Sequence, residues 1–373
     1  MNTHEPRPGG AAAGAFALVF IALSGLLTGT IFLTKWYRAE QGRRARAYFN
    51  QGERLTATEN YGTAIEQYRN ALSISRENRV YRRAIALALM KLGRRDEAAI
   101  YFHELLREDP DGALPNLMLA RIEAGEGMTP LAVDDYHRAI FGYWPENAEA
   151  NRRRARWELV ELLEKGGSPK QVLAELLELA DEERDDPAAR KRIGHLLLAY
   201  GSAAQSAELF RDVIRESSQR GHRDAEAEAG LGEAELARGN YREAQNALRR
   251  AVWENPRDTA AEKRLATVNE ILELDPTARM LSAAARYERS RTLVERAVVD
   301  VTACAKEGSA PPPDLDAARK ALANRVKRGA YADATESDIA LAERLWAARA
   351  GLCGNQAASD EPLARVLAHL SEK

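Results

Sequence analysis

The chain has 373 residues, with 54 basic side chains against 56 acidic ones, so its net charge is close to zero. It lacks the overall positive field that favours nucleic acids, and no nucleic-acid partner is expected. The only two cysteines, Cys304 and Cys353, do not form the closely spaced ligand pairs of a metal motif, and neither a metal nor another cofactor is expected. Ala, Leu, Arg and Glu dominate, as in helical proteins, and the Ala- and Arg-rich usage suggests a bacterium.

The N-terminal region begins with a short polar tail, residues 1–10, and continues with an uncharged apolar stretch, residues 11–34. A helix over this stretch spans about 36 Å, enough to cross a hydrocarbon core of about 30 Å. Trp36 and Tyr37 follow it within a basic juxtamembrane segment, residues 35–44, as an interfacial anchor should. We therefore predict an uncleaved single-pass transmembrane helix. The alternative is a cleaved signal peptide, which has a shorter apolar run and a more basic start.

Two glycines inside the predicted span, Gly25 and Gly29, are four residues apart. This spacing lets two membrane helices approach closely, because packing drives their association in lipid. The hypothesis is a homodimer through this helix, or contact with a partner's membrane helix. The alternative is that the glycines have no such role, since glycine is frequent in membrane helices.

From residue 45 onward, small, aromatic and aliphatic residues recur with a period of 34 residues. A fixed period of this size indicates stacked helix pairs, in which small residues allow close helix crossings. The recurring sets are Ala64, Tyr68 and Ala71; Ala98, Phe102 and Leu105; Ala132, Tyr136 and Ala139; and, after an insertion, Ser206, Phe210 and Val213, then Ala244, Leu248 and Ala251.

The repeats resemble tetratricopeptide repeats, most clearly over residues 225–258. There the family's spacing is matched by Leu231, Gly232, Gly239, Tyr241, Ala244, Leu248, Ala251 and Pro256. The predicted units are 45–78, 79–112, 113–146, 153–186, 187–220 and 225–258, with a further helix from 259, so the solenoid covers 45–276. The resemblance implies an all-α superhelical solenoid of helix pairs. To it we add the N-terminal transmembrane helix and a helical C-terminal cap.

The period is least regular at the fourth unit, which follows an insertion at residues 147–152. Its helix start is still clear, because Ser168 is a good N-cap and Pro169 suits the first turn; Thr129 and Pro130 predict the same in the third unit. The change of phase led us to expect a specific binding surface around Arg121, Trp157 and Lys165.

Beyond Pro276 the period fails, and residues 277–373 are expected to form a helical cap or a small separate domain. Apolar spacing predicts a long helix over 277–306, and a proline run at 311–313 breaks the chain. Further helices are predicted near 314–328, 335–351 and 361–371.

The family resemblance implies that a protein partner, as a peptide or a helix, binds the concave face. Residues there that carry basic or apolar side chains could hold an acidic or C-terminal peptide, or could simply keep the solenoid soluble. In this family, co-chaperones bind the C-terminus of a heat-shock protein with a lysine and an asparagine on the first helix. This chain has Phe49 and Glu53 there, so the resemblance does not imply that kind of binding. The predicted groove residues are Phe49, Arg83, Lys91, Leu117, Arg121, Trp157, Lys165, Lys191 and His195.

No phosphate loop, nucleophile elbow, zinc-protease or calcium motif is present, and we expect the chain not to be an enzyme. Acidic pairs such as Asp134–Asp135 are interpreted as solvated. His103 and His137 hold the same position in successive units, which permits a metal hypothesis, but two solvated histidines are the simpler interpretation.

The side of the membrane is left open by two opposing arguments. Basic residues after the span, Lys35, Arg38, Arg43, Arg44 and Arg46, favour a cytoplasmic repeat domain at the inner membrane. A disulfide between Cys304 and Cys353 would instead imply the periplasm. Charge favours the cytoplasmic side.

The predicted function is a membrane-anchored scaffold or adaptor that binds a protein partner through the repeat groove. One alternative is an assembly or quality-control factor for an envelope, secretion or polymer-export machine. A third hypothesis is an enzyme with its site in the C-terminal segment, where only the two cysteines are unusual nucleophiles.

Overall fold

The computed structural model describes residues 10–304, 312–353 and 361–371; the side chains of residues 10–19, 22, 304 and 350–353 are outside the description. Over these residues the chain is helical and forms no strand, so the predicted all-α class is confirmed. Two compact units are distinguished, residues 1–166 and residues 167–373. Each is described by itself below.

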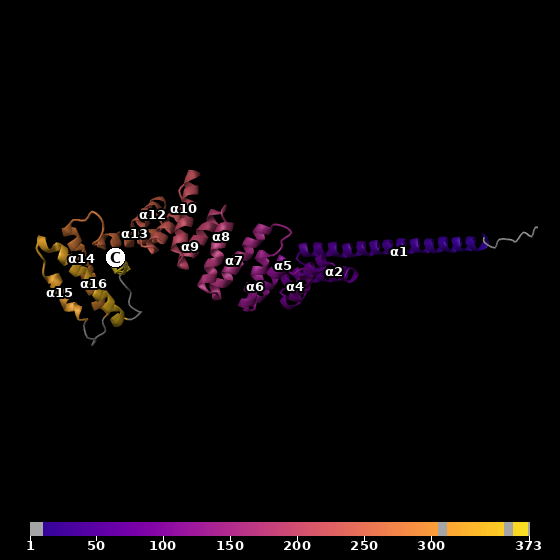
Figure 1. Ribbon diagram of the computed structural model, residues 1–373, viewed down its shortest axis with the longest axis horizontal. Helices are drawn as coiled ribbons and strands as arrows, with labels where there is room; N and C mark the ends of the chain where they lie inside the picture. Colours follow the sequence, from indigo (N-terminus) through magenta and orange to yellow (C-terminus); the bar gives the residue numbers. More distant parts are fainter. Residues whose placement is uncertain (1–9, 305–311, 354–360, 372–373) are drawn as a thin grey trace, which may run out of the picture. The chain divides into compact units, whose positions relative to one another are not determined.

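The first unit is a series of helices in which each helix packs on the next (Figure 1). These helices are α1 Gly10–Ala57, α2 Tyr61–Ile74, α3 Arg79–Lys91, α4 Arg95–Glu108, α5 Ala113–Gly125, α6 Thr129–Phe141 and α7 Ala148–Gly166. Pairs α1–α2, α3–α4 and α5–α6 correspond to the first three predicted repeats.

Helix α1 is longer than any segment predicted for this region. The apolar stretch, the juxtamembrane segment and the first helix of the first repeat form one continuous helix, Gly10–Ala57. No proline interrupts it, and residues 35–57 are rich in Arg, Ala and Glu, which favour helix. Figure 1 shows α2 beside only the C-terminal part of α1.

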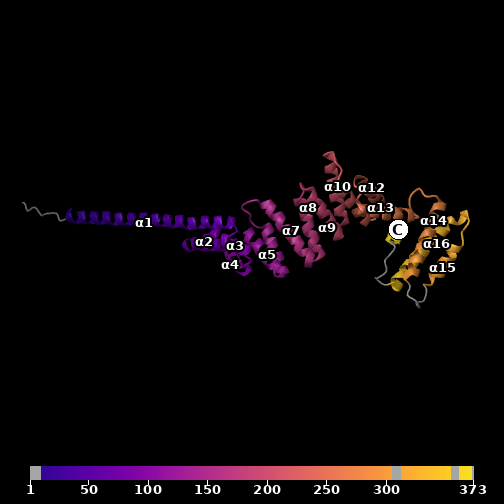
Figure 2. The ribbon, with the colours of Figure 1, turned by 180° about the vertical axis from the view of Figure 1, so that it is seen from behind.

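The second unit continues the helix pairs and ends in a helical tail. Its helices are α8 Pro169–Glu182, α9 Pro187–Ala199, α10 Ala203–Gln219, α11 Ala225–Ala237, α12 Tyr241–Glu254, α13 Thr259–Leu274, α14 Ala283–Cys304, α15 Asp314–Ala323, the short 3₁₀ helix η1 Arg328–Ala330, α16 Tyr331–Cys353 and α17 Glu361–Ser371. Helices α14, α15 and α16 pack together, as both Figure 1 and Figure 2 show, and α17 packs mainly on α13. The tail helices lie close to the predicted ranges, with shifts of a few residues at their ends.

The core consists of the side chains that recur in the sequence. Every member of the five recurring sets is buried, and the most exposed, Tyr136, has only 4% of its surface accessible. Burial of these positions stabilises each helix pair against its neighbours, because apolar burial contributes about 25 cal/mol per Å². The period therefore marked the core correctly.

Most turns between paired helices use one backbone conformation, but the turn between α7 and α8 contains no residue with a positive φ. Gly93, Gly127, Gly201 and Gly239 have φ values of +74° to +84°, a region that L side chains rarely adopt. In the first repeat Glu59 stands at the same position with φ 59°. Glu59 is therefore the one non-glycine residue of the first repeat that adopts a positive φ.

The predicted helix starts differ in outcome. Ser168 caps α8 with a capping box to Gln171, and Pro169 is the first helical residue, as expected. Thr129 is wrong as a cap, since α6 begins one residue earlier than predicted, with Met128 at the N-cap and Thr129 already helical. The proline that follows fits either of the first two helical positions, so it does not fix the boundary.

Candidate partner-binding groove

The first unit contains an open groove between the first helices of its three repeats. Its volume is ≈ 600 Å³, a size typical of sites that hold small molecules or peptide side chains. Helices α1, α2, α3 and α5 supply its walls, which are mostly apolar and aromatic. The lining residues are Phe49, Glu53, Thr56, Tyr61, Tyr68, Val80, Arg83, Ala84, Leu87, Ala88, Met90, Lys91, Met118 and Arg121.

An aromatic group forms one end of the groove. The Phe49 ring lies 5.5 Å from the Tyr68 ring and 5.0 Å from the Tyr81 ring, between centroids. The Tyr68 hydroxyl donates a hydrogen bond to Glu53 Oε1 at 2.5 Å and lies 2.9 Å from Thr56 Oγ1. Burial, and then the hydrogen bond to Glu53, raise the pKa of Tyr68 to about 12. This wall is therefore pre-organised, and its charged acceptor is already paired.

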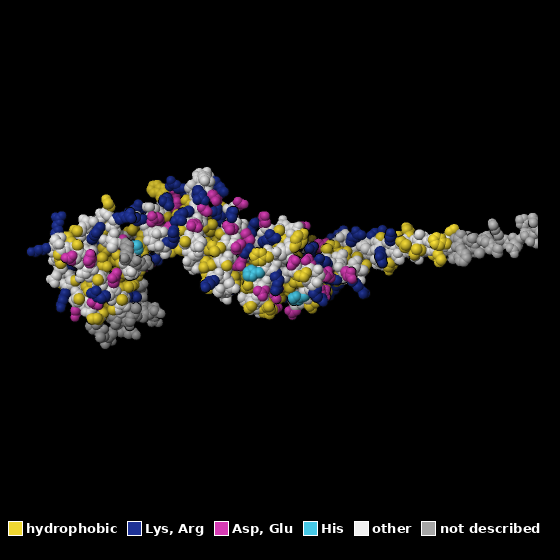
Figure 3. Space-filling model, viewed as in Figure 1, with side chains coloured by type: hydrophobic (Ala, Val, Ile, Leu, Met, Phe, Trp, Pro, Cys, Tyr) yellow, Lys and Arg dark blue, Asp and Glu magenta, His cyan; other side chains and the backbone are white. Residues whose placement is uncertain are grey.

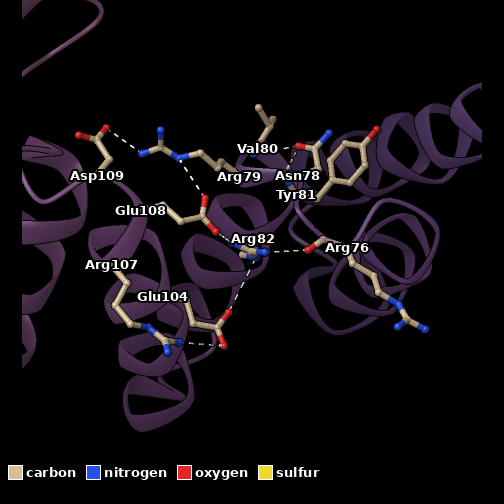
Figure 4. A network of polar contacts seen from close by, with 10 residues as sticks. All are labelled: Arg76, Asn78, Arg79, Val80, Tyr81, Arg82, Glu104, Arg107, Glu108 and Asp109. Atoms are coloured by element: carbon tan, nitrogen blue, oxygen red, sulfur yellow. Dashed lines mark hydrogen bonds and ion pairs between the residues drawn. The ribbon is translucent and has the colours of Figure 1, made fainter.

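Two arginines on α3 beside the groove are held by acidic side chains at the end of α4 (Figure 4). Arg79 Nη2 lies 2.7 Å from Asp109 Oδ2, and Arg82 forms ion pairs with Glu104 and Glu108. Arg82 also donates to the carbonyl oxygen of Arg76 at 2.8 Å. These contacts fasten the second repeat's two helices to each other and neutralise both guanidinium groups.

Arg83 and Lys91 differ from those neighbours. Both are exposed and line the groove, and no described acidic side chain pairs with either of them. They stand on one face of α3 with Leu87 between them, because residues four apart on a helix lie above one another. The groove thus presents two available cations on either side of an apolar side chain.

Arg121 also lines the groove, but its charge is already used. Its guanidinium makes a two-pronged contact with Glu158 on α7, at 2.8 Å and 2.7 Å, and Tyr136 donates to the same carboxylate at 3.3 Å. The hydrogen bond that Arg121 donates to Glu158 raises the pKa of Arg121. The sequence leaves open whether Arg121 binds a partner's carboxylate; in the structure its guanidinium already pairs with Glu158.

The other predicted residues lie elsewhere. Leu117 is 3% exposed and belongs to the core rather than to the groove wall. Trp157, partly buried, and Lys165, exposed, are on α7 and do not line the groove. In the second unit, Lys191 Nζ lies 3.0 Å from Asp224 and 2.6 Å from Glu226, so its charge is compensated. His195 packs edge-on against Phe210 at 5.0 Å.

Two family models match the chain at the repeats that build this groove. One tetratricopeptide repeat model matches residues 45–78 and another matches residues 84–112. These segments are tetratricopeptide repeats. Their match spans helices α1 to α4, which supply most of the lining side chains. No curated protein matches the sequence.

Among the solved structures that resemble the chain, one is described as a tetratricopeptide protein. The tetratricopeptide protein YrrB, described with an unusual peptide-binding site, is 19% identical, with a TM-score of 0.39 over 52% of this chain and 96% of its own. PilF of Pseudomonas aeruginosa is 14% identical, with a TM-score of 0.38 over 61% and 99%. The type IV pilus biogenesis factor PilW is 16% identical, with a TM-score of 0.35 over 60% and 98%. Scores this low do not establish a common overall arrangement.

Four other predictions concern the membrane span, its two glycines, the two cysteines and a metal site. No helix in the described part of the chain is both long and apolar enough to span a membrane. Gly25 and Gly29 lie on α1 with open space where a Cβ would stand. Cys304 and Cys353 end α14 and α16, and their side chains lie outside the described residues, so their pairing stays a prediction. No three His, Cys, Asp or Glu side chains among the described residues are grouped to hold a metal.

One pair of acidic side chains was missed by sequence reasoning. We interpreted Asp135 as solvated, but it is 5% exposed and pairs with Arg138 on the same helix. Glu123 on α5 has a buried Oε2 atom with no hydrogen-bond partner. Burial, and then the charge of Asp135, raise the pKa of Glu123 to about 7. Sequence spacing gave no sign that these helices would bring the two carboxyl groups together.

Replacing Glu123 with glutamine should stabilise the protein at pH 8 but not at pH 4.5. The pKa of Glu123 is about 7 in the folded protein and about 4.5 in the unfolded chain. The contribution of neutral Glu123 to the free energy of unfolding is therefore fully present below pH 4.5 and is lost as the pH rises to 7. Glu123 is partly exposed, so we expect about 1–2 kcal/mol. Urea unfolding of both proteins at the two pH values measures this. The exposed Glu149→Gln is the control, and an equal effect of E123Q at both pH values would contradict the prediction.

Proposed function

We propose that this protein is a membrane-tethered adaptor whose first two repeats and the start of the third bind a partner segment that carries acidic and apolar side chains. The observation that carries the proposal is the pair of available cations, Arg83 and Lys91, placed on both sides of Leu87 in an apolar groove. A carboxylate gains charge-assisted hydrogen bonds there, and apolar side chains gain burial.

The charge pattern favours an acidic partner over a neutral one. Arg79, Arg82 and Arg121 are each held by carboxylates of this chain, whereas Arg83 and Lys91 face the groove without such a partner among the described side chains. Two exposed cations on an apolar wall offer an acidic partner segment both charge-assisted hydrogen bonds and apolar contact. This specificity is electrostatic, so it should weaken at high salt.

The proposed tether is the apolar stretch at residues 11–34. The part of α1 that follows residue 19 carries exposed apolar side chains, shown in yellow in Figure 3, which water disfavours. They include Phe20, Ile21, Leu23, Leu26, Leu27, Ile31, Phe32 and Leu33. Trp36 and Tyr37 are exposed just beyond them, where an interfacial anchor is expected.

The proposed tether also suggests on which side of the membrane the repeat domain lies and how two membrane helices could associate. The arginines and the lysine that follow the stretch favour a cytoplasmic repeat domain. Gly25 and Gly29, with open space beside them on α1, would permit a second membrane helix to pack closely. The partner-binding groove would then be presented at the inner face of the cytoplasmic membrane.

One recruitment experiment tests the adaptor. Full-length chain in mild detergent first selects binders from a random 12-residue peptide display library; peptides with Asp or Glu beside Leu or Phe are expected. Inverted inner-membrane vesicles that carry the chain are then washed with carbonate and should capture a fluorescent copy of the selected peptide. Right-side-out vesicles should not, since the groove would lie inside them.

Variants separate the two parts of the proposal. Arg83→Gln with Lys91→Gln should stay in the membrane but bind the peptide at least about tenfold more weakly, because two charged contacts are lost. The control pair, Arg107→Gln with Arg154→Gln, removes two exposed cations elsewhere and should bind normally. A chain without residues 1–34 should bind peptide yet remain in the supernatant. Peptides without acidic residues, or release of the full chain by carbonate, would count against the groove or the tether respectively.

A further inference from the structure

A second, smaller pocket adjoins the groove. Its volume is ≈ 260 Å³, and its walls come from the starts of α3 and α5, from Leu105 on α4 and from the loops that follow α4 and α6. Val80 and Arg83 line both cavities, so α3 forms the ridge between them. The remaining lining residues are Arg79, Leu105, Asp109, Gly112, Ala113, Leu114, Pro115, Tyr143 and Pro145.

The loop that carries Tyr143 is held firmly to the neighbouring repeat. The amide of Tyr143 donates to Asp111 O at 2.8 Å, and the amide of Ala113 donates to Tyr143 O at 3.2 Å. The next residue, Trp144, is 8% exposed and donates from its indole nitrogen to Ala139 O at 2.9 Å. A Cβ at Gly142 would lie only 2.6 Å from Arg138 O and 2.8 Å from Asp111 O, so the loop needs glycine there. A loop fixed at this many points does not move to hide its exposed side chain.

Tyr143 is that exposed side chain. It has 67% of its surface accessible and stands beside Pro145 at the pocket, an arrangement that offers an apolar surface with a hydroxyl at its edge. The other arginine in this pocket, Arg79, is paired with Asp109. The available charge in the second pocket is therefore Arg83, the same cation that faces the groove.

We propose that the second pocket is a subsite for the same partner segment, which carries an acidic residue over Arg83 and an apolar side chain on each side of it. One apolar side chain enters the groove beside Leu87, and the other packs against Tyr143 and Pro145. This rests on the proposed function of the groove and specifies its ligand. Val80 and Arg83 each line both cavities, so a short segment that crosses these two side chains can reach both.

The test repeats the library selection on full-length chain with Tyr143→Ala. Peptides selected by the wild type should carry the acidic residue with apolar residues on both sides. Tyr143→Ala should lose the second apolar preference, keep the acidic one, and bind wild-type peptides about five- to tenfold more weakly. Tyr143→Phe keeps the ring and should bind as the wild type does. Trp253→Ala, at a residue 77% exposed in the second unit, is the matched control and should change nothing.

The outcomes separate this inference from the function on which it rests. If the wild type selects peptides with an acidic residue and a single apolar anchor, the groove stands and the second subsite is refuted. Selection of the same two-anchor peptides by Tyr143→Ala, at unchanged affinity, also refutes it. If the wild type enriches no peptide, the proposed function fails, and the subsite fails with it.

Discussion

Phe210→Ala is expected to destabilise the second unit by about 3–5 kcal/mol. Phe210 is completely buried on α10, and its ring packs against Gly194 on α9 and Gly230 on α11. His195 contacts the ring edge-on at 5.0 Å. Because the two facing positions are glycines, no side chain there can move into the space that the ring leaves. The cavity should stay open, and its cost adds to the lost burial.

The same geometry predicts that the effect of Gly230→Ala on stability depends on whether Phe210 is present. Gly230→Ala alone places a Cβ within the Phe210 ring and should destabilise the protein by about 1–3 kcal/mol. In the Phe210→Ala background that overlap is gone, and alanine favours the helix over glycine by up to about 1 kcal/mol. The second substitution should then stabilise. This reversal is a coupling between two residues in direct contact.

Urea unfolding of the full chain in detergent, followed by circular dichroism, measures all four proteins of this cycle. Phe141→Ala is the control, because that ring is 75% exposed and its loss should change stability by no more than about 0.5 kcal/mol. Equal destabilisation by Gly230→Ala in both backgrounds would show that the glycine is needed for a reason other than the ring.

The sequence predicted the core of the repeats because their packing is repeated. Tyr68, Phe102, Tyr136, Phe210 and Leu248 each meet the same surroundings in successive helix pairs, so spacing alone identified them as buried. Contacts that recur in each helix pair produce a periodic pattern in the sequence, and the buried residues of these repeats show that pattern.

The groove could be predicted only in part, since its electrostatics depend on pairs far apart in the chain. The repeat pattern placed both Arg83 and Arg121 on the concave face, yet Glu158 pairs with Arg121, whereas no described acidic side chain pairs with Arg83. The loop around Tyr143 shows the same limit. Nothing in the run of aromatic residues says that Trp144 turns inward while Tyr143 stays exposed, because this depends on contacts with residues 111–113.

Leu363→Asp is expected to release α17 and cost at least about 3 kcal/mol, because a charge would replace a fully buried side chain. Leu363, Val366 and Leu367 are all buried in the core that includes α13. The helix is also tied to the last repeat, since Tyr241 donates to Arg365 O and Arg365 donates to Leu236 O, both at 3.4 Å. Ala368→Asp places the same charge on the exposed face of α17 and is the matched control.

The same variant decides between a cap and a separate C-terminal domain. A solenoid must cover its last apolar face, and α17 packs on α13, the last helix that continues the repeats. If the tail is a cap, Leu363→Asp should speed amide hydrogen exchange in α13, at Val268 and Ile271, because that face becomes open to water. If α17 belongs to a domain with its own stability, exchange should rise in α17 alone, and α13 should stay protected. Unchanged exchange in both helices would show that α17 contributes little to either, despite its buried leucines.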